Sequence, residues 1–361
     1  MSKLISRTDQ DVGKGAIDRP DDFFQPRAWR HEEIAGGPIQ VIWKEKNPAK
    51  GEFVTYPKRH QGKQSSCVTY VLAKQLTVDE FSENGVWREL SPHSLYPYVV
   101  QPGGGSNSFQ ATKLVSKQGM TLESLFKSDG LSEAEISVDN GYAYDARQVA
   151  LVYKPQSFVQ ASSDFDTIAG IIQNHRDQGI KKVVGVTVIG QNNGTWIGSA
   201  FPIKPNNPND PNIWYHRICI TDFGLINGKK ALALDNSWGE IPGFKGQQFL
   251  FEDYQPFMYG AIYTLNQPDN WQQLGISSVI PPKHQWYTNL TVGSKGSDVT
   301  ALQIALQSMG MFPISTIVKP TGAFYGITKK GVELFQASMA LPVTGIVDEA
   351  TRVKLNTIFK G

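Results

Sequence analysis

Residues 61–68 read Gln-Gly-Lys-Gln-Ser-Ser-Cys-Val and place one of the chain's 2 cysteines directly after two serines. Serine commonly caps a helix, and the residues that follow are apolar at helical spacing (Val68, Val71, Leu72 and Leu76). Cys67 is therefore predicted to lie at the N-terminus of a helix. The partial positive charge at that end favours the thiolate, which is the nucleophilic form of a cysteine.

A thiolate nucleophile needs a base beside it, a group that orients the base, and donors for the oxyanion that forms. The downstream sequence offers a base in His216, within a Tyr-His-Arg tripeptide, and an orienting group in Asn236, which begins an Asn-Ser-Trp-Gly motif. Strands are predicted over residues 218–223 and 231–234, joined by the hairpin dipeptide Asn-Gly at residues 227–228. This hairpin returns Asn236 toward His216.

These motifs make the chain resemble the papain-like cysteine peptidases. The Asn-Ser-Trp-Gly motif matches the family signature, and residues 54–67 resemble the segment that carries the family's nucleophile. The resemblance implies Cys67 as nucleophile, His216 as base, Asn236 as the residue that orients the base, and Gln61 as the oxyanion-hole side chain. It also implies hydrolysis of peptide bonds in a peptide or protein substrate, without a metal ion or an organic cofactor.

A substrate-binding surface follows from the same resemblance. Gly104 and Gly105 correspond to the family's substrate-binding turn and would bind the substrate backbone by extended pairing, although a glycine run after a proline also suits an ordinary turn. Trp238 would shield the hydrogen bond between His216 and Asn236 from water.

The chain also departs from the family. Gln64 stands where the family has a cysteine, and the partner cysteine before the glycine turn is absent as well, so the usual disulfide is missing. Val68 replaces an indole, and Arg217 puts a cation where a small residue is common. Cys219 is interpreted as core packing, because it lies on a predicted apolar strand three residues after His216. A bridge between Cys219 and Cys67 is possible with 2 cysteines, but it would remove the nucleophile.

The predicted fold class is α+β, with a papain-like two-lobed fold followed by a small three-helix domain. An N-terminal extension over residues 1–50 precedes the peptidase domain over residues 51–266, in which a helical lobe carries the nucleophile and a β-rich lobe carries the base. A linker over residues 267–289 leads to the C-terminal domain over residues 290–361. Two interpretations of the extension stay open: it covers the cleft, or it packs onto the domain surface.

Patterning within the peptidase domain predicts helices over residues 121–127 and 164–178, and strands over residues 183–189 and 249–254. The run 183–189 is the longest apolar stretch. Because it has only the length of a strand, no membrane insertion is expected.

The C-terminal residues carry a small internal repeat. Val299, Leu302, Leu306 and Met309 form one apolar helical face, and two Gly-to-Thr segments, 322–328 and 345–351, each precede a predicted helix. With these motifs residues 290–361 resemble the three-helix peptidoglycan-binding domain. The resemblance implies peptidoglycan as a partner, whereas a purely structural or protein-packing role is the alternative.

Composition excludes nucleic acid as a partner and indicates where the protein is made. The net charge of +2 and the absence of a Lys/Arg run give no nucleic-acid surface. The first residues turn polar at once and lack a secretory apolar core, and 2 cysteines give no disulfide framework. We therefore expect synthesis in the cytoplasm without a signal peptide, so that action at a cell wall would need lysis, phage delivery or specialised secretion.

Together these observations favour a bacterial or phage cysteine endopeptidase directed at peptidoglycan or wall-associated protein. Two alternatives stay open. One is an intracellular protein-processing peptidase whose last domain recognises protein, and the other is a catalytically silent papain-like scaffold used for binding.

Overall fold

The computed structural model describes residues 16, 29–30, 40–139, 147, 150–151, 153–155, 157–207, 212–239, 246–265, 282–308, 311, 320–339 and 341–359. The chain divides into two compact units, one formed by Met1–Gly141 with Tyr153–Asn266, and one formed by Tyr142–Val152 with Gln267–Gly361. Most of the predicted N-terminal extension and linker lies outside the described residues. None of the described helices is long and apolar enough to cross a membrane.

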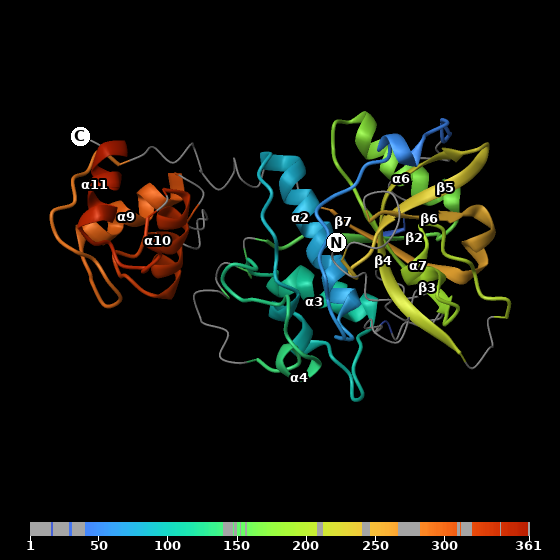
Figure 1. Ribbon diagram of the computed structural model, residues 1–361, viewed down its shortest axis with the longest axis horizontal. Helices are drawn as coiled ribbons and strands as arrows, with labels where there is room; N and C mark the ends of the chain where they lie inside the picture. The colour runs from blue at the N-terminus through green and yellow to red at the C-terminus, as the bar shows by residue number, and fades with distance from the viewer. Residues whose placement is uncertain are drawn as a thin grey trace, which may run out of the picture. The chain divides into compact units, whose positions relative to one another are not determined.

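The first unit combines helices with one large sheet (Figure 1). Its strands are β1 (Trp29–Arg30), β2 (Ser157–Ala161), β3 (Val184–Gln191), β4 (Ile213–Ile226), β5 (Lys229–Asp235), β6 (Gln248–Phe251) and β7 (Met258–Leu265). Its α-helices are α2 (Cys67–Asn84), α3 (Ser108–Gln118), α4 (Glu133–Ile136), α6 (Phe165–Asp177) and α7 (Thr195–Gly198). Short 3-10 helices are η2 (Pro48–Lys50), η3 (Pro92–Ser94), η4 (Tyr96–Tyr98) and η5 (Glu252–Phe257).

The sheet brings the two downstream motifs together. Its strand order is β1-β2-β7-β3-β4-β5-β6, and every pair except β1–β2 is antiparallel. Strands β4 and β5 form the predicted hairpin, whose turn residues Asn227 and Gly228 have φ of 52° and 74°. Positive φ at both positions is what the tight hairpin turn requires. Because Cys219 pairs with Asp235, the end of β5 returns to the part of β4 that carries His216.

A large apolar core fixes this arrangement. Residues of the sheet and of α6 pack into one buried cluster that includes Trp196, Trp214 and Trp238. The three indoles meet edge to face, with ring centroids 5.5 to 6.3 Å apart. Aromatic pairs of this kind add to the free energy gained by burying the rings. Helix α2 packs against the neighbouring part of β4, as Figure 1 shows.

Two sequence predictions in this unit are corrected. Residues 121–127 form a turn instead of a helix, because the Glu123 carboxylate accepts hydrogen bonds from the backbone N–H groups of Ser128 (2.6 Å) and Asp129 (3.1 Å). The strand predicted over residues 249–254 ends at Phe251, where η5 begins. The helix over 164–178 and the strand over 183–189 are confirmed as α6 and β3.

The second unit contains α9 (Ser297–Ser308), α10 (Gly326–Ser338) and α11 (Glu349–Ile358), drawn in orange to red in Figure 1. Its internal repeat is also structural. Gln303 accepts a hydrogen bond from the Gly322 N–H and donates to the Ala323 carbonyl, and Gln336 bonds in the same way to the turn before α11. The described part of the unit also buries Trp286 completely.

Candidate active site

Cys67 is the first residue of α2, as the sequence predicts. The Ser66 carbonyl accepts hydrogen bonds from the backbone N–H groups of Thr69 (3.0 Å) and Tyr70 (3.1 Å), which starts the helix. Ser66 occupies the capping position, but its hydroxyl donates to the Gln64 side chain (2.8 Å) instead of capping the helix. The Cys67 side chain thus lies within the positive end of an 18-residue helix, where a thiolate is favoured.

Strand β4 supplies the wall facing this thiol. The backbone N–H of Arg217 lies 3.5 Å from the Cys67 Sγ, so the strand that carries His216 passes directly beside the sulfur. Both Cys67 and His216 have no exposed surface. Neither cysteine of the chain is in a disulfide, which excludes a bridge between Cys67 and Cys219.

The His216 ring is held by an amide. Its Nε2 lies 2.8 Å from the Asn236 Oδ1. The Asn236 Nδ2 in turn donates to the Gln248 Oε1 (3.2 Å), and the Gln248 Nε2 donates to the backbone carbonyls of Trp196 (2.7 Å) and Ser199 (3.1 Å). This relay joins β4 to β6 through three buried side chains.

The relay also fixes the tautomer of His216. Backbone carbonyls only accept, so the Gln248 nitrogen must face them and its oxygen must face Asn236. Asn236 therefore presents its nitrogen to Gln248 and its oxygen to His216. In a neutral His216 ring the proton then lies on Nε2, and the Nδ1 carries the lone pair that can accept a proton.

The Asn-Ser-Trp-Gly motif surrounds this pair. The Trp238 indole stacks on the His216 ring with centroids 4.3 Å apart and an interplanar angle of 27°. Gly239 has a φ of 76°, and a Cβ there would come within 2.9 Å of the His60 ring. The close approach of His60 therefore requires glycine at this position.

Gln61 is joined to the same motif. Its backbone N–H donates to the Ser237 carbonyl (2.8 Å), its Oε1 accepts from the Ser237 hydroxyl, and its Nε2 donates to the Gln64 carbonyl (2.6 Å). The structure thus brings Gln61, Cys67, His216 and Asn236 to one place, between the start of α2 and the end of the β4–β5 hairpin.

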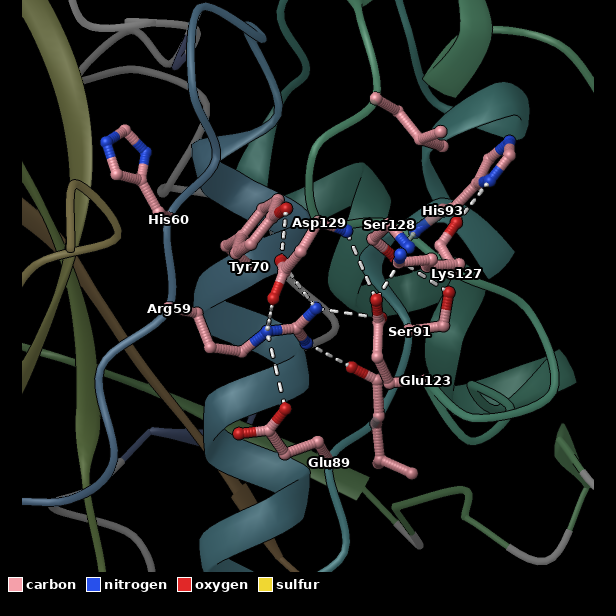
Figure 2. A network of polar contacts seen from close by, with 12 residues as sticks. Arg59, His60, Tyr70, Glu89, Ser91, His93, Glu123, Lys127, Ser128 and Asp129 are labelled. Carbon is pink, nitrogen blue, oxygen red and sulfur yellow. Dashed lines mark hydrogen bonds and ion pairs between the residues drawn. The ribbon is translucent and has the colours of Figure 1, made fainter. Parts of the chain in front are cut away.

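A cluster of charges anchors the segment before Gln61 (Figure 2). The Arg59 guanidinium forms ion pairs with Glu123 (2.7 Å) and Asp129 (2.8 Å) and donates to the Leu90 carbonyl (2.6 Å). The Arg59 carbonyl accepts a hydrogen bond from the Gly239 N–H (2.9 Å). Arg59 therefore links the loop around residue 129 to the Asn-Ser-Trp-Gly motif.

Gln64, which stands where the resemblance leads us to expect a disulfide cysteine, forms hydrogen bonds instead. The Gln64 amide donates to the carbonyls of Ser128 (3.1 Å) and Leu131 (2.7 Å), which ties the segment before Cys67 to the loop of residues 128–131. The Ser65 N–H donates to Glu133 (2.6 Å), and Glu133 also accepts from the Tyr96 hydroxyl (2.6 Å).

The predicted substrate turn lies beside this loop. A Cβ on Gly104 would meet the Ser65 and Glu133 side chains at 3.2 Å, so Gly104 packs directly against the segment before Cys67. The Gly105 N–H donates to the Tyr96 hydroxyl (3.0 Å), and its carbonyl accepts from the Gln101 N–H (2.9 Å).

Ser106, which follows Gly105, already pairs with another part of the chain. It forms a parallel bridge with Ala16 of the N-terminal extension, and Ala16 is buried. The backbone beside the predicted substrate turn can therefore pair with another backbone.

Cys219 has a different environment. It packs with Val71, Val78 and Val183 in an apolar cluster, and burial raises the pKa of its thiol above the ordinary value. A neutral thiol in such surroundings is inert, which agrees with its interpretation as core.

Several residues of the site were not found from the sequence. Gln248, Glu133 and Tyr96 belong to no motif, and their roles depend on contacts between segments far apart in the chain. Among the described residues no cluster of three or more His, Cys, Asp or Glu side chains could hold a metal ion.

Comparison with solved structures gives the fold. The chain superposes on xylellain, a cysteine protease from Xylella fastidiosa, with a TM-score of 0.54 and 14% identity, covering 73% of this chain and 100% of that one. The proform of the Amb a 11 cysteine protease, a major ragweed pollen allergen, gives a TM-score of 0.51 and 15% identity, covering 72% and 77%. The fold is papain-like.

Part of the C-terminal unit matches a family model. Residues 295–355 match the family model described as "Putative peptidoglycan binding domain". A search of curated proteins found no match. At these identities the relation to the cysteine proteases is one of fold. The predicted fold class, a papain-like unit followed by a small helical C-terminal domain, is confirmed.

Proposed function

We propose that the chain is a cysteine endopeptidase in which Cys67 is the nucleophile, His216 the base and Asn236 the residue that orients the base. The observation that carries the proposal is the placement of Cys67 at the start of α2, with the Arg217 N–H 3.5 Å from its sulfur and the preceding residue, His216, hydrogen-bonded to Asn236.

The tautomer of His216 supports its role as base. While the Nε2–H of His216 donates a hydrogen bond to Asn236, the Nδ1 accepts the proton of the Cys67 thiol. The thiolate then attacks the substrate carbonyl, which forms a C–S bond and an oxyanion. An N–H of the Gln61 side chain and the Cys67 backbone N–H stabilise this oxyanion.

The second half of the cycle returns the proton. The Nδ1–H of His216 protonates the leaving amine as the C–N bond breaks. Water, which loses a proton to His216, then attacks the thioester, and the acid product leaves as the C–S bond breaks. Trp238, stacked on the imidazole, keeps water away from the hydrogen bond that orients the base.

Substrate backbone pairs at Gly104 and Gly105. The bridge between Ser106 and Ala16 supports this assignment, because backbone pairing already occurs at the residue next to Gly105.

The C-terminal domain holds the enzyme at bacterial peptidoglycan, so that its substrates are wall cross-links or wall-associated protein. The match of residues 295–355 to the peptidoglycan-binding model supports this target.

The proposal is tested by incubating the full chain with purified sacculi and, separately, with an unfolded protein, and by identifying new amino termini by mass spectrometry. A chain that begins at residue 40 is tested in parallel, because Ala16 pairs with Ser106. Cys67→Ala removes the proposed nucleophile, and Cys219→Ala is the matched control because it removes the other thiol.

We expect products from sacculi that depend on Cys67 and not on Cys219. Cleavage of protein but not of sacculi would move the assignment to a general protein-processing peptidase. The absence of any Cys67-dependent product from either chain would favour a binding scaffold.

A further inference from the structure

A bridge of hydrogen bonds joins the predicted substrate turn to the segment before the nucleophile. The Gly105 N–H donates to the Tyr96 hydroxyl (3.0 Å), and this hydroxyl donates to one oxygen of the Glu133 carboxylate (2.6 Å). The other carboxylate oxygen accepts from the N–H of Ser65 (2.6 Å), two residues before Cys67. Two side chains therefore connect the turn to the residues that lead into α2.

The direction of each hydrogen bond in this bridge is fixed. A backbone N–H can only donate, so the Tyr96 oxygen accepts from Gly105 and its single proton points to Glu133. Burial of Tyr96 and the Glu133 carboxylate beside it raise the pKa of the hydroxyl above its ordinary value, so it keeps this proton at neutral pH. The carboxylate accepts at both oxygens, which an amide cannot do because one of its two ends is a donor.

The substrate turn depends on such a contact because it has no side chains of its own. Residues 103–105 are three successive glycines with φ of 82° to 90°. Glycine loses more conformational entropy on folding than any other residue, so hydrogen bonds must hold the turn in place. The Gly104 N–H and the Gly105 carbonyl both bond to the Gln101 backbone and close the turn on itself, whereas the Gly105 N–H ties it to Tyr96.

Glu133 also packs directly against the turn. A Cβ on Gly104 would meet the Glu133 Oε1 and the Ser65 Oγ at 3.2 Å, so the turn, the carboxylate and the segment before Cys67 touch at one point. The family resemblance places a disulfide between the same two segments, but neither of its cysteines is present in this chain. The hydrogen-bonded bridge is therefore a link between these segments that does not depend on a disulfide.

We propose that Tyr96 and Glu133 are positioning residues that hold the substrate turn at a fixed place relative to Cys67. A substrate backbone paired at Gly104 and Gly105 then presents its scissile carbonyl to the thiol. This inference rests on the proposed peptidase function. Because the turn binds substrate backbone equally before and during the reaction, loss of the bridge weakens substrate binding and leaves the reactivity of the thiol unchanged.

Alkylation of Cys67 in the full chain by two reagents tests the proposal. Iodoacetamide reports the reactivity of the thiol alone, because it is too small to pair with the turn. An acetyl-dialanyl chloromethyl ketone carries a peptide backbone, so its rate should saturate and give a half-saturating concentration for binding and a limiting rate for reaction. Mass spectrometry of the digested protein verifies that the label is on Cys67.

Two variants break the bridge at different links. Tyr96→Phe removes the hydroxyl but keeps the buried ring, and Glu133→Gln removes one of the two acceptors. We expect each to raise the half-saturating concentration of the ketone about tenfold, with the limiting rate and the iodoacetamide rate within about threefold of the wild type. The double variant should behave like either single variant, because the bridge is broken only once.

The matched controls lie on the same two elements. Tyr98→Phe removes the hydroxyl of another tyrosine of η4, which donates to Asp139 outside the bridge. Glu135→Gln alters the capping box of α4, where the Glu135 carboxylate accepts from the Ser132 N–H (2.8 Å). Neither control should change binding of the ketone. Thermal unfolding verifies that each variant is folded, and either bridge variant that folds tests the proposal.

The proposal is overturned if the ketone binds the bridge variants as it binds the wild type, if both reagents lose rate equally, or if the two losses add in the double variant. Failure of the proposed function gives a different result: neither reagent would label Cys67 in the wild type, and the inference would fall with it.

Discussion

Two buried glutamines, Gln248 in the papain-like unit and Gln336 in the C-terminal unit, both donate hydrogen bonds to backbone carbonyls. They differ in the group from which their side-chain oxygen accepts. Gln336 donates to the Ile346 carbonyl (2.8 Å) and accepts from the Gly345 N–H (2.9 Å), which ties a turn to its helix. Gln248 also donates to backbone carbonyls, but its oxygen accepts from Asn236, whose own oxygen contacts an imidazole.

The difference separates a structural amide from a positioning amide. The Gln336 network ends on backbone groups and on the hydroxyls of Thr344 and Thr351, so it stabilises the fold and orients no ionisable ring. A network that ends on an ionisable ring fixes which nitrogen carries the proton, and therefore what the ring can do. Substitutions in the Gln336 network should therefore lower the free energy of unfolding, whereas substitutions in the Gln248 network should lower kcat.

The largest effect is expected at the end of the Gln248 relay. Asn236→Ala removes the group that orients His216 and fixes its tautomer, so kcat should fall by about 100-fold to 1,000-fold with a smaller change in KM. Steady-state hydrolysis of a peptide substrate measures both constants. A kcat within threefold of the wild type would contradict the role of Asn236.

The next effect is on stability in the C-terminal unit. Gln336→Leu leaves the Thr344 and Gly345 N–H groups without their buried acceptor, which should cost about 3 kcal/mol of unfolding free energy. Hydrogen exchange followed by mass spectrometry over residues 320–359 measures this loss. Hydrolysis of a soluble peptide should not change, and a parallel loss of activity would break the comparison.

A smaller effect is expected at Gln248 itself. Gln248→Met keeps the shape of the side chain but removes the acceptor for Asn236, so kcat should fall about tenfold. Gln247→Met is the matched control, because Gln247 is an adjacent buried glutamine that donates to the Val54 carbonyl (2.7 Å) outside the relay. Equal losses of kcat in the two variants would show that the effect is one of general packing.

The smallest effect compares the two repeated turns. Asp348 caps α11 by accepting from the Thr351 N–H (2.9 Å), whereas Tyr325, in the corresponding place before α10, makes no side-chain cap. Asp348→Ala should cost about 1 kcal/mol of unfolding free energy at neutral pH.

Hydrogen bonds from the Thr351 backbone N–H and hydroxyl lower the pKa of the Asp348 carboxyl. A lowered pKa in the folded state stabilises the fold above the ordinary pKa of about 3.9, and this stabilisation is lost as the pH falls further. Urea unfolding at several pH values should therefore show the gap between wild type and Asp348→Ala closing below about pH 4. A gap independent of pH would show that the charge of Asp348 plays no part.

The sequence predicted what depends on local pattern and on motifs. The helix after Cys67, the hairpin at Asn227 and the repeat in the C-terminal unit all follow from spacing and turn chemistry. The convergence of Cys67 with His216 came from the family resemblance, because the register of a hairpin is not readable from one sequence.

What the sequence missed depends on contacts between distant segments. Gln248 appears as one of two adjacent glutamines, and nothing local shows which of them meets Asn236. The helix expected at residues 121–127 fails for the same reason, because Glu123 bonds to a following loop and to Arg59. Tertiary contacts override helix propensity in so short a segment.

The claim that Cys67 and His216 form a reactive pair is tested most directly by titrating the thiolate. The ultraviolet absorbance of the thiolate is followed against pH for the wild type, for Cys67→Ala and for His216→Ala. The account predicts that the signal due to Cys67 appears with a midpoint below about pH 7 and moves upward in His216→Ala. A midpoint at or above about 8.5, unchanged by the loss of His216, would contradict it.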